Sequence, residues 1–344
     1  MTASAEPINL LIITGGPGSE HDVSLASAAS ASTHLDSARY RVTTVILDRT
    51  GRWCDAAGTP LPRRVEDLVR LVQRADVVLP LMHGKIGEDG SLAAVLDTCG
   101  TPYVGSGVRA GAVAMDKHLM KLLAVDAGIN VAAGVLVDGR ETVPPFDPPL
   151  FIKPNAEGSS YGVQRVSTVD DFAAAVAEAA VFDPRVLVEK EIAGREIDVA
   201  VLETADGTLR VGPPLEIVVK DAEFFGTAEK YDGGAAFLVP APIPDEATTR
   251  LRDHAARLYR LLGCTGVARF DFFLTDDGGL VLNEVNTAPG MTAASQVPLM
   301  FAEDGLPYSK LLDTLVDAAM AVPKIARQAA DQLERAPARY DSQL

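Results

Sequence analysis

Cysteine, tryptophan, long apolar stretches and basic runs are all scarce in this sequence of 344 residues. Its three cysteines, Cys54, Cys99 and Cys264, lie far apart and form neither a CxxC pair nor an even disulfide framework. No stretch approaches the ~18 uninterrupted apolar residues of a membrane span, and the first residues lack the pattern of a signal peptide. We therefore expect a cytoplasmic protein with free thiols and no membrane contact.

A basic surface is also missing. Lys and Arg together number 31 against 47 Asp and Glu, which gives a net charge of −16. Such a surface repels a phosphate backbone, and no Lys/Arg run offers a local patch, so we expect no nucleic-acid partner. Hydrophobic residues make up 47% and charged residues 23%, which excludes disorder. The length predicts two or three domains.

The first third of the chain alternates short apolar runs with helical stretches, which predicts an α/β domain around a parallel sheet. The predicted strands are residues 8–14, 41–47 and 76–81, and the predicted helices are residues 24–32 and 66–73. Gly15-Gly16 and His83-Gly84 follow two of these strands. Ligands bind at the carboxyl ends of parallel strands, so we expect both loops to share one crevice.

From about residue 107 the pattern predicts an α+β region in which strands outnumber helices and pair antiparallel. The predicted strands are 149–153, 163–166, 186–190, 197–202, 215–219, 266–274 and 279–286, and the predicted helices are 110–125, 170–180 and 246–262. Residues from Pro323 onward are polar and rich in Ala and Arg, as in an appended helix or tail. We predict domains at residues 1–106, 107–188 and 189–322, followed by a tail at 323–344.

Asp271, Glu284 and Asn286 form the first candidate site. Glu284 and Asn286 are two residues apart on a strand and point to the same face, and a short Asp-Asp-Gly-Gly turn folds Asp271 against them. Three oxygen ligands on a hairpin suit Mg²⁺. The alternative is two exposed strand carboxylates that solvate a sheet edge. Arg269 on the same face favours the metal site.

Lys117, Lys153 and Lys190 form a second set around the loop Gly158-Ser159-Ser160. Each lysine alone is typical of a side chain that extends from a strand or helix to solvent. Three of them around a loop with open backbone N–H groups favour phosphate binding. The loop lacks the GK[ST] of a P-loop, which excludes a P-loop NTPase.

A third candidate is the turn from Gly15 to Ser24, where a glycine-rich segment enters a helix. Glu20 at this helix start is stabilised by the helix dipole with or without a function. The turn lacks the GxGxxG of a dinucleotide site, so by itself it indicates little.

Eight motifs in order distinguish this chain: GGPGSEHDVSLASA, HGKIGEDG, AMDKHLMK, IKPNAEGSSYGV, VEKEIAGREI, EKYDGG, ARFDFF and NEVNTAPGMTAAS. The series resembles the D-alanine–D-alanine ligases of the ATP-grasp superfamily, over residues 8–320. The resemblance implies an ATP-grasp fold, in which an N-terminal parallel-sheet domain precedes two α+β subdomains that clasp ATP. It also implies a cytoplasmic, ADP-forming ligase of peptidoglycan synthesis and a homodimer.

The resemblance assigns residues to ATP and to metal. The ATP-binding set that it implies is Lys117, Lys153, Ser160, Glu189, Lys190, Ile192 and Glu196. Asp271, Glu284 and Asn286 match the family's ligands for two Mg²⁺ ions, for which Mn²⁺ can substitute. The family phosphorylates the carboxylate of one D-alanine, and the amine of a second D-alanine then attacks the acyl phosphate. In such a reaction, most of the rate acceleration comes from positioning the reactants and from neutralising the charge of the transferred phosphoryl group.

The resemblance also implies a substrate site. Glu20 would hold the first ammonium group near His83, and Arg269 with the Gly290 N–H would stabilise the oxyanion. Ser159 and Tyr231 would extend a hydrogen-bonded line from Glu20. The remaining implied substrate contacts are Val23, Lys230, Ser295 and Gln296.

The chain departs from the family pattern in three places, and these leave alternatives open. Its lid reads FFGTAE over residues 224–229 in place of a tyrosine-rich run. Tyr161 replaces a small aliphatic residue and Gln296 an apolar one, and both could border the second substrate. The alternative is a ligase that joins D-alanine to D-serine, D-lactate or a specialised-metabolite amine, although Tyr231 favours D-alanine. A second alternative is an ATP-binding module without catalysis, which the intact metal and Arg269 positions do not favour.

Overall fold

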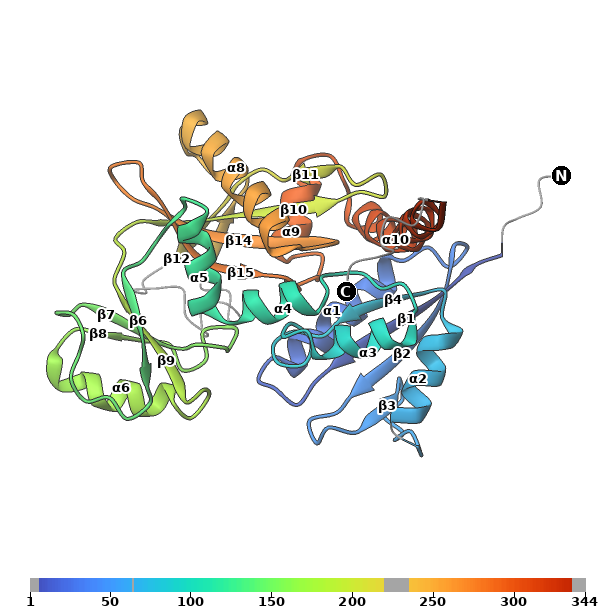
Figure 1. Ribbon diagram of the computed structural model, residues 1–344, viewed down its shortest axis with the longest axis horizontal. Coiled ribbons are helices and arrows are strands. Elements are labelled where there is room, and N and C mark those ends of the chain that lie inside the picture. Colours follow the sequence, from blue (N-terminus) through green and yellow to red (C-terminus); the bar gives the residue numbers. More distant parts are fainter. Residues whose placement is uncertain (1–5, 64, 220–234, 336–344) are drawn as a thin grey trace, which may run out of the picture.

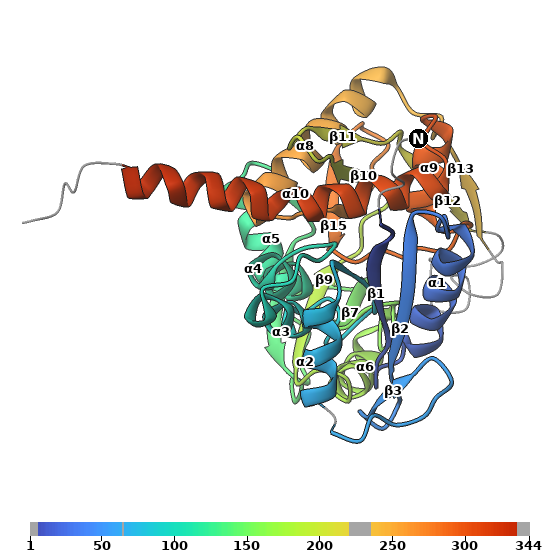
Figure 2. The ribbon, with the colours of Figure 1, turned by 90° about the vertical axis from the view of Figure 1, so that its right-hand side faces the viewer.

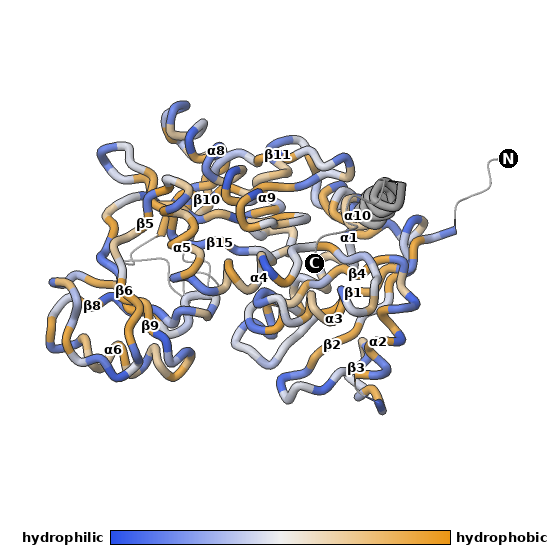
Figure 3. The backbone as a smooth tube through the Cα atoms, viewed as in Figure 1, coloured by the Kyte–Doolittle hydropathy of each residue, from blue (hydrophilic) through white to orange (hydrophobic). Residues whose placement is uncertain are grey.

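The computed structural model describes residues 6–63, 65–219 and 235–335. Figure 1 shows an N-terminal sheet in blue, a central sheet in green and a larger sheet in yellow and orange. Apolar residues gather along the strands and polar residues along the connecting loops, as Figure 3 shows. The arrangement confirms the predicted combination of α/β and α+β parts in an ATP-grasp fold.

The N-terminal sheet has the order β3-β2-β1-β4. Its strands are β1 (Ile8–Gly15), β2 (Tyr40–Leu47), β3 (Trp53–Asp55) and β4 (Val77–Leu81). β1 is parallel to β2 and β4, as predicted, and the short β3 adds an antiparallel edge. Helix α1 (His21–His34) covers one face, and α2 (Val65–Arg74) and α3 (Ser91–Cys99) cover the other (Figure 2). Because β1 and β4 are parallel, the loops that follow them leave the same edge of the sheet.

The central sheet is antiparallel and has the order β6-β9-β7-β8. Its elements are β6 (Gly134–Asp138), β7 (Leu150–Pro154), β8 (Gln164–Val166), β9 (Arg185–Lys190), a 3-10 turn (Val169–Asp171) and α6 (Phe172–Ala179). Helix α6 buries Phe172 and Val176 against Ile152 and Val188. This packing leaves the other face of the sheet open toward the larger sheet.

The larger sheet has the order β13-β12-β10-β14-β15-β5, with β11 paired to β10. Its strands are β5 (Asn130–Val131), β10 (Arg195–Glu203), β11 (Leu209–Val211), β12 (Leu215–Val219), β13 (Ala235–Leu238), β14 (Val267–Leu274) and β15 (Leu280–Asn286). The pairs are antiparallel except β15 with β5. Helix α8 (Asp245–Leu262) packs on one face, and α9 (Gln296–Glu303) lies near β10 on the other.

One predicted helix is wrong. The sequence pattern predicts a single helix over residues 110–125, whereas the structure holds two, α4 (Val108–Met115) and α5 (Lys117–Asp126). Asp116 separates them in an extended conformation, and its carboxylate accepts a hydrogen bond from the Leu119 N–H. Aspartate is a favoured N-cap because it satisfies a free N–H at a helix start. The break places Lys117 at the first position of α5.

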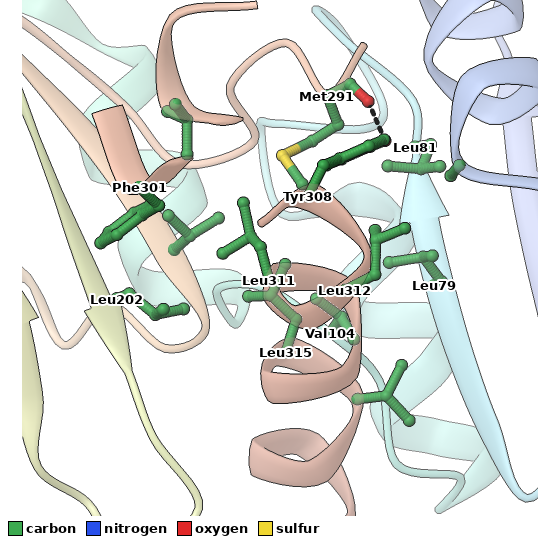
Figure 4. Packing of buried hydrophobic residues seen from close by; sticks show 14 of the residues in the cluster. Leu79, Leu81, Val104, Leu202, Met291, Phe301, Tyr308, Leu311, Leu312 and Leu315 are labelled. Atoms are coloured by element: carbon green, nitrogen blue, oxygen red, sulfur yellow. Dashed lines mark hydrogen bonds between the residues drawn. The ribbon is translucent and has the colours of Figure 1, made fainter. Parts of the chain in front are cut away.

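The N-terminal and larger sheets share one apolar core, seen in Figure 4. In this core, Leu79 and Leu81 on β4 lie on the side of Leu312, and Phe301 of α9 lies on the opposite side near Leu202 (Figure 4). Helix α10 (Tyr308–Arg335) supplies Leu312 and runs across both sheets (Figure 2). The helix continues past Pro323, where the sequence pattern predicts an appended helix or tail, through Arg335. The predicted domain boundaries stay predictions. In the described part of the chain, no helix is both long and apolar enough to cross a membrane.

Candidate active site

Two cavities meet between the three sheets. The first, of about 350 Å³, lies between the central and larger sheets, and the second, of about 660 Å³, lies between the N-terminal sheet and β14 and β15. Lys117, Glu157 and Glu284 line both. The two cavities therefore adjoin, so that a molecule in one can react with a molecule in the other.

The first cavity contains a buried cluster of two lysines and a glutamate. Glu189 on β9 is 1% exposed and pairs with Lys121 Nζ through Oε1 and with Lys153 Nζ through Oε2, the latter at 2.8 Å. Burial by itself raises the pKa of Glu189, but the two ammonium groups lower it to about 2. Burial also lowers the pKa of Lys121 to about 8. Glu189 is therefore an ionised acceptor in the cavity wall.

Sequence reasoning missed Lys121. It lies four residues after Lys117 on α5, so the two side chains share one face of the helix, and this spacing was the available signal. Lys117 itself donates to the Glu157 carbonyl at 2.6 Å and lies 3.6 Å from Glu284. Lys117 therefore places positive charge where the two cavities meet.

Other predicted ATP-binding residues lie along the first cavity. Ser160, Glu189, Lys190, Ile192 and Glu196 all line it. The Lys190 ammonium lies 5.3 Å from the centre of the Phe146 ring. The glycine loop has left-handed backbone at Ser159 and Ser160, with φ of 48° and 57°. Such conformations are uncommon outside glycine and gather at ligand-binding segments.

Glu20 and Ser159 meet in the second cavity, as predicted, although 139 residues separate them. The Ser159 hydroxyl donates to Glu20 Oε1 across the gap between α1 and the glycine loop. Val23 and Tyr161 line the same space. The carboxylate is thus placed to bind an ammonium group.

His83 joins the N-terminal sheet to the segment after β15. Its Nδ1 lies 2.7 Å from the Ala288 carbonyl, and its Nε2 lies 2.9 Å from the Ser27 hydroxyl. Burial lowers the pKa of His83, but Glu88 and Glu20 raise it more, so that the net pKa lies above the usual value. His83 therefore adds a polar group to the cavity wall near Glu20.

Arg269 lies on the floor of the second cavity between two carboxylates. Its Nε and a terminal nitrogen donate to the two oxygens of Asp271 at 2.7 and 2.8 Å, and its Nε lies 3.4 Å from Asp198. Burial lowers the pKa of Arg269, and Asp271 and Asp198 more than offset this, so the guanidinium stays charged. Burial and the Asp271 charge together raise the pKa of Asp198 well above that of an ordinary aspartate.

The predicted metal ligands are brought together by strand register. Asp271 on β14 pairs with Glu284 on β15, and Arg269 pairs with Asn286. Both oxygens of Asp271 accept hydrogen bonds from Arg269, and the Asn286 side-chain oxygen accepts from the Ala288 N–H at 3.0 Å. Among the described residues, no three His, Cys, Asp or Glu side chains are arranged as a metal site. Two carboxylates and an amide oxygen nevertheless form a hard donor set that fits Mg²⁺ in type.

The far wall of the second cavity is the segment that leads into α9. Gly290, Ser295 and Gln296 all line the cavity. The Ser295 hydroxyl accepts a hydrogen bond from the Thr292 N–H, and the Gln296 side-chain amide donates to Asp198 at 2.8 Å. The predicted residues Lys230 and Tyr231 and the 224–229 lid lie outside the described residues.

Comparison with known families decides the identity. Residues 9–68 and 58–106 match the family model described as D-ala D-ala ligase N-terminus, and residues 140–317 match the D-ala D-ala ligase C-terminus. The chain belongs to the D-alanine–D-alanine ligase family. The resemblance stated from the motifs is thereby confirmed.

Individual members of the family are similar over nearly their whole length. The D-alanine–D-alanine ligase A of Mesorhizobium japonicum is 39% identical, and the alignment covers 92% of this chain and 98% of that protein. The D-alanine–D-alanine ligase of Mycobacterium tuberculosis strain CDC 1551 is also 39% identical, with 91% and 96% covered.

Two solved structures of D-alanine ligases share this architecture. The VanG D-Ala:D-Ser ligase from Enterococcus faecalis has a TM-score of 0.79 and 32% identity, covering 91% of this chain and 100% of that one. The Bacillus anthracis D-alanine–D-alanine ligase complexed with ATP has a TM-score of 0.77 and 27% identity, covering 93% and 99%. The similarity therefore extends over all three sheets.

Proposed function

We propose that this chain joins two D-alanine molecules to D-alanyl-D-alanine for peptidoglycan precursors, and converts ATP to ADP and phosphate. The observation that carries the proposal is the junction of the two cavities at Lys117, Glu157 and Glu284. A nucleotide in the first cavity and an amino acid in the second would face each other there. The family to which the chain belongs supports the same reaction.

The first cavity fits the nucleotide. Lys117 and Lys153 supply positive charge for phosphates, and ionised Glu189 is an acceptor for an amino group of the base. Asp271, Glu284 and Asn286 would hold Mg²⁺, with Mn²⁺ as a substitute. The metal, when bound, would neutralise charge on the phosphates during transfer.

The second cavity fits two amino acids. Glu20 would bind the first ammonium group and leave the carboxylate of this D-alanine toward the phosphates. After that carboxylate becomes an acyl phosphate, the amine of the second D-alanine attacks its carbonyl carbon and phosphate leaves. Arg269 and the Gly290 N–H would stabilise the oxyanion, because fixed donors need no reorganisation as its charge develops.

The acceptor side completes the proposal. Ser295 would bind the second carboxylate, and Ser159 would orient the second amine from its place on Glu20. The roles predicted for Lys230 and Tyr231 remain part of the proposal, as do the homodimer and the cytoplasmic location.

Product analysis by mass spectrometry tests this function. Purified protein with ATP, Mg²⁺ and D-alanine alone is expected to form D-alanyl-D-alanine and release one phosphate per dipeptide. Parallel reactions add D-lactate or D-serine in equal amount, and D-alanine is expected to remain the preferred acceptor. A dominant mixed product, or no dipeptide from D-alanine alone, contradicts the proposal.

A further inference from the structure

A buried carboxylate that the proposed chemistry does not use lies beneath the second cavity. Asp198 is the fourth residue of β10, in the interior of the larger sheet, and is 0% exposed. Its register partners are Leu215 on β12 and Asp271 on β14. Ionisable side chains rarely occupy such positions without partners, so the contacts of Asp198 indicate its role.

Asp198 connects two elements through one oxygen. Its Oδ2 accepts a hydrogen bond from Gln296 Nε2 at 2.8 Å and lies 3.4 Å from Arg269 Nε. Among the described residues, no donor hydrogen-bonds to its Oδ1. One side chain therefore links the guanidinium on β14 to the first residue of α9.

The wall segment, residues 290–296, has one residue of the apolar core near its start and leads into a helix that carries another. Met291 and Phe301 are buried in the shared core, where the Tyr308 hydroxyl donates to the Met291 carbonyl (Figure 4). Ser295 and Gln296 lie between these anchors and line the cavity. The hydrogen bond from Gln296 to Asp198 thus ties the exposed part of the wall segment to the sheet below.

From this geometry we propose that Asp198 is a positioning residue for the acceptor half of the site. By holding Gln296 and Arg269 on one carboxylate, it sets the distance between the wall segment and the oxyanion donor. The proposal rests on the proposed function, because that function assigns the second D-alanine to this wall. A leucine or methionine at position 296 could not be held in this way, so the polar pair defines the acceptor pocket of this chain.

The test compares four variants of the Asp198–Gln296 pair and one control variant with the wild-type protein. Asp198→Ala removes the acceptor for Gln296, and Asp198→Asn keeps an oxygen that can accept the same hydrogen bond. Gln296→Leu removes the donor, and the double variant Asp198→Ala/Gln296→Leu removes both. Asp313→Asn is the matched control, because Asp313 is a partly buried carboxylate bound to Tyr40 and Arg39 at a distant contact.

Initial rates over a range of D-alanine concentrations, fitted with separate constants for the two molecules, provide the first readout. Asp198→Ala is expected to raise KM for the second D-alanine by about fivefold, the lower end of the scale for an unpaired donor, because the Gln296 amide is only partly buried. KM for ATP is expected to change less than about twofold, and Asp198→Asn to restore most of the loss. The double variant should be no worse than the worse single variant, because both changes break one contact.

A purely structural role gives a different result. Three results would overturn the proposal. They are a parallel rise in KM for ATP and for the second D-alanine, multiplicative effects in the double variant, and an equal rise in KM for Asp198→Asn and Asp198→Ala. The control Asp313→Asn is expected to lower the melting temperature and to leave KM for ATP and KM for the second D-alanine unchanged.

Hydrogen exchange provides a readout that does not depend on the proposed function. Asp198→Ala is expected to speed amide exchange in residues 290–300 relative to the wild type, Asp198→Asn and Asp313→Asn. Unchanged exchange in that segment refutes the positioning role. Absence of dipeptide from the wild-type protein would refute the proposed function instead, and the exchange result would still decide the role of Asp198.

Discussion

Replacing Glu189 by glutamine tests the buried charge cluster of the first cavity. The change keeps the shape of the side chain and removes its charge, which leaves Lys121 and Lys153 facing each other. Because the folded pKa of Glu189 is about 2 and the ordinary value is 4.5, ionisation of this group favours the folded state. A difference of about 2.5 units corresponds to about 3 kcal/mol at 1.36 kcal/mol per unit.

The structure also limits how much stability the Glu189→Gln substitution can remove. Lys121 already has its pKa lowered to about 8 by burial, and without Glu189 it would release its proton near neutral pH. A neutral amine relieves the repulsion with Lys153. We therefore expect Glu189→Gln to lower the free energy of unfolding at pH 7 by about 2–3 kcal/mol.

Urea titration followed by circular dichroism measures the effect. A carboxylate with a lowered folded pKa stabilises the protein above its unfolded pKa and loses this contribution as the pH falls through the folded value. The difference between the wild type and Glu189→Gln should therefore be largest above about pH 5 and shrink toward pH 3. Asp304→Asn is the control, because its pair with Arg210 is exposed and worth about 1 kcal/mol at most. Equal stability at pH 7, or a difference that does not change with pH, refutes the reasoning.

Four further results are expected. Arg269→Ala should lower kcat by about a hundredfold or more, because it removes a fixed charge at the oxyanion; a change in KM alone would contradict this. Glu284→Gln should abolish Mg²⁺-dependent ATP consumption with an unchanged circular dichroism spectrum, and near-normal activity would refute the metal assignment. Dipeptide yield should rise between about pH 6 and pH 9 as the second amine loses its proton, and a flat profile would argue against amine attack. Gly87→Ala should prevent stable folding in a thermal melt, because its Cβ would lie 1.9 Å from the Met82 carbonyl oxygen, and a wild-type melting temperature would contradict this.

Much of the secondary structure follows from local sequence patterns. The apolar runs of β1 and β4 and the hairpin of β14 and β15 were predicted to within about two residues at each end, the usual scatter of element boundaries. Period-2 spacing places Glu284 and Asn286 on one face with no knowledge of the fold. The helix break at Asp116 was also open to local reasoning, because aspartate is a common N-cap, and it was missed among the surrounding helical residues.

The ordered motifs by themselves determined the family and the predicted site residues. Each motif combines glycine turns, strand ends and charged residues at fixed spacing, and these features are local in the chain. They indicate which residue types are available for chemistry. They do not indicate which side chains meet.

Only the tertiary structure decided which of these side chains are in contact. Ser159 reaches Glu20 across 139 residues, Lys121 reaches Glu189 across 68, and Gln296 reaches Asp198 across 98. Each contact joins elements from different sheets or layers, so it depends on how those layers pack rather than on the preference of any one segment. Burial increases the free-energy cost of a missing contact, because a charge removed from water needs a partner, and packing decides where that partner lies. A sequence pattern can show that Asp198 is acidic on an apolar strand, but only packing places Gln296 and Arg269 beside it.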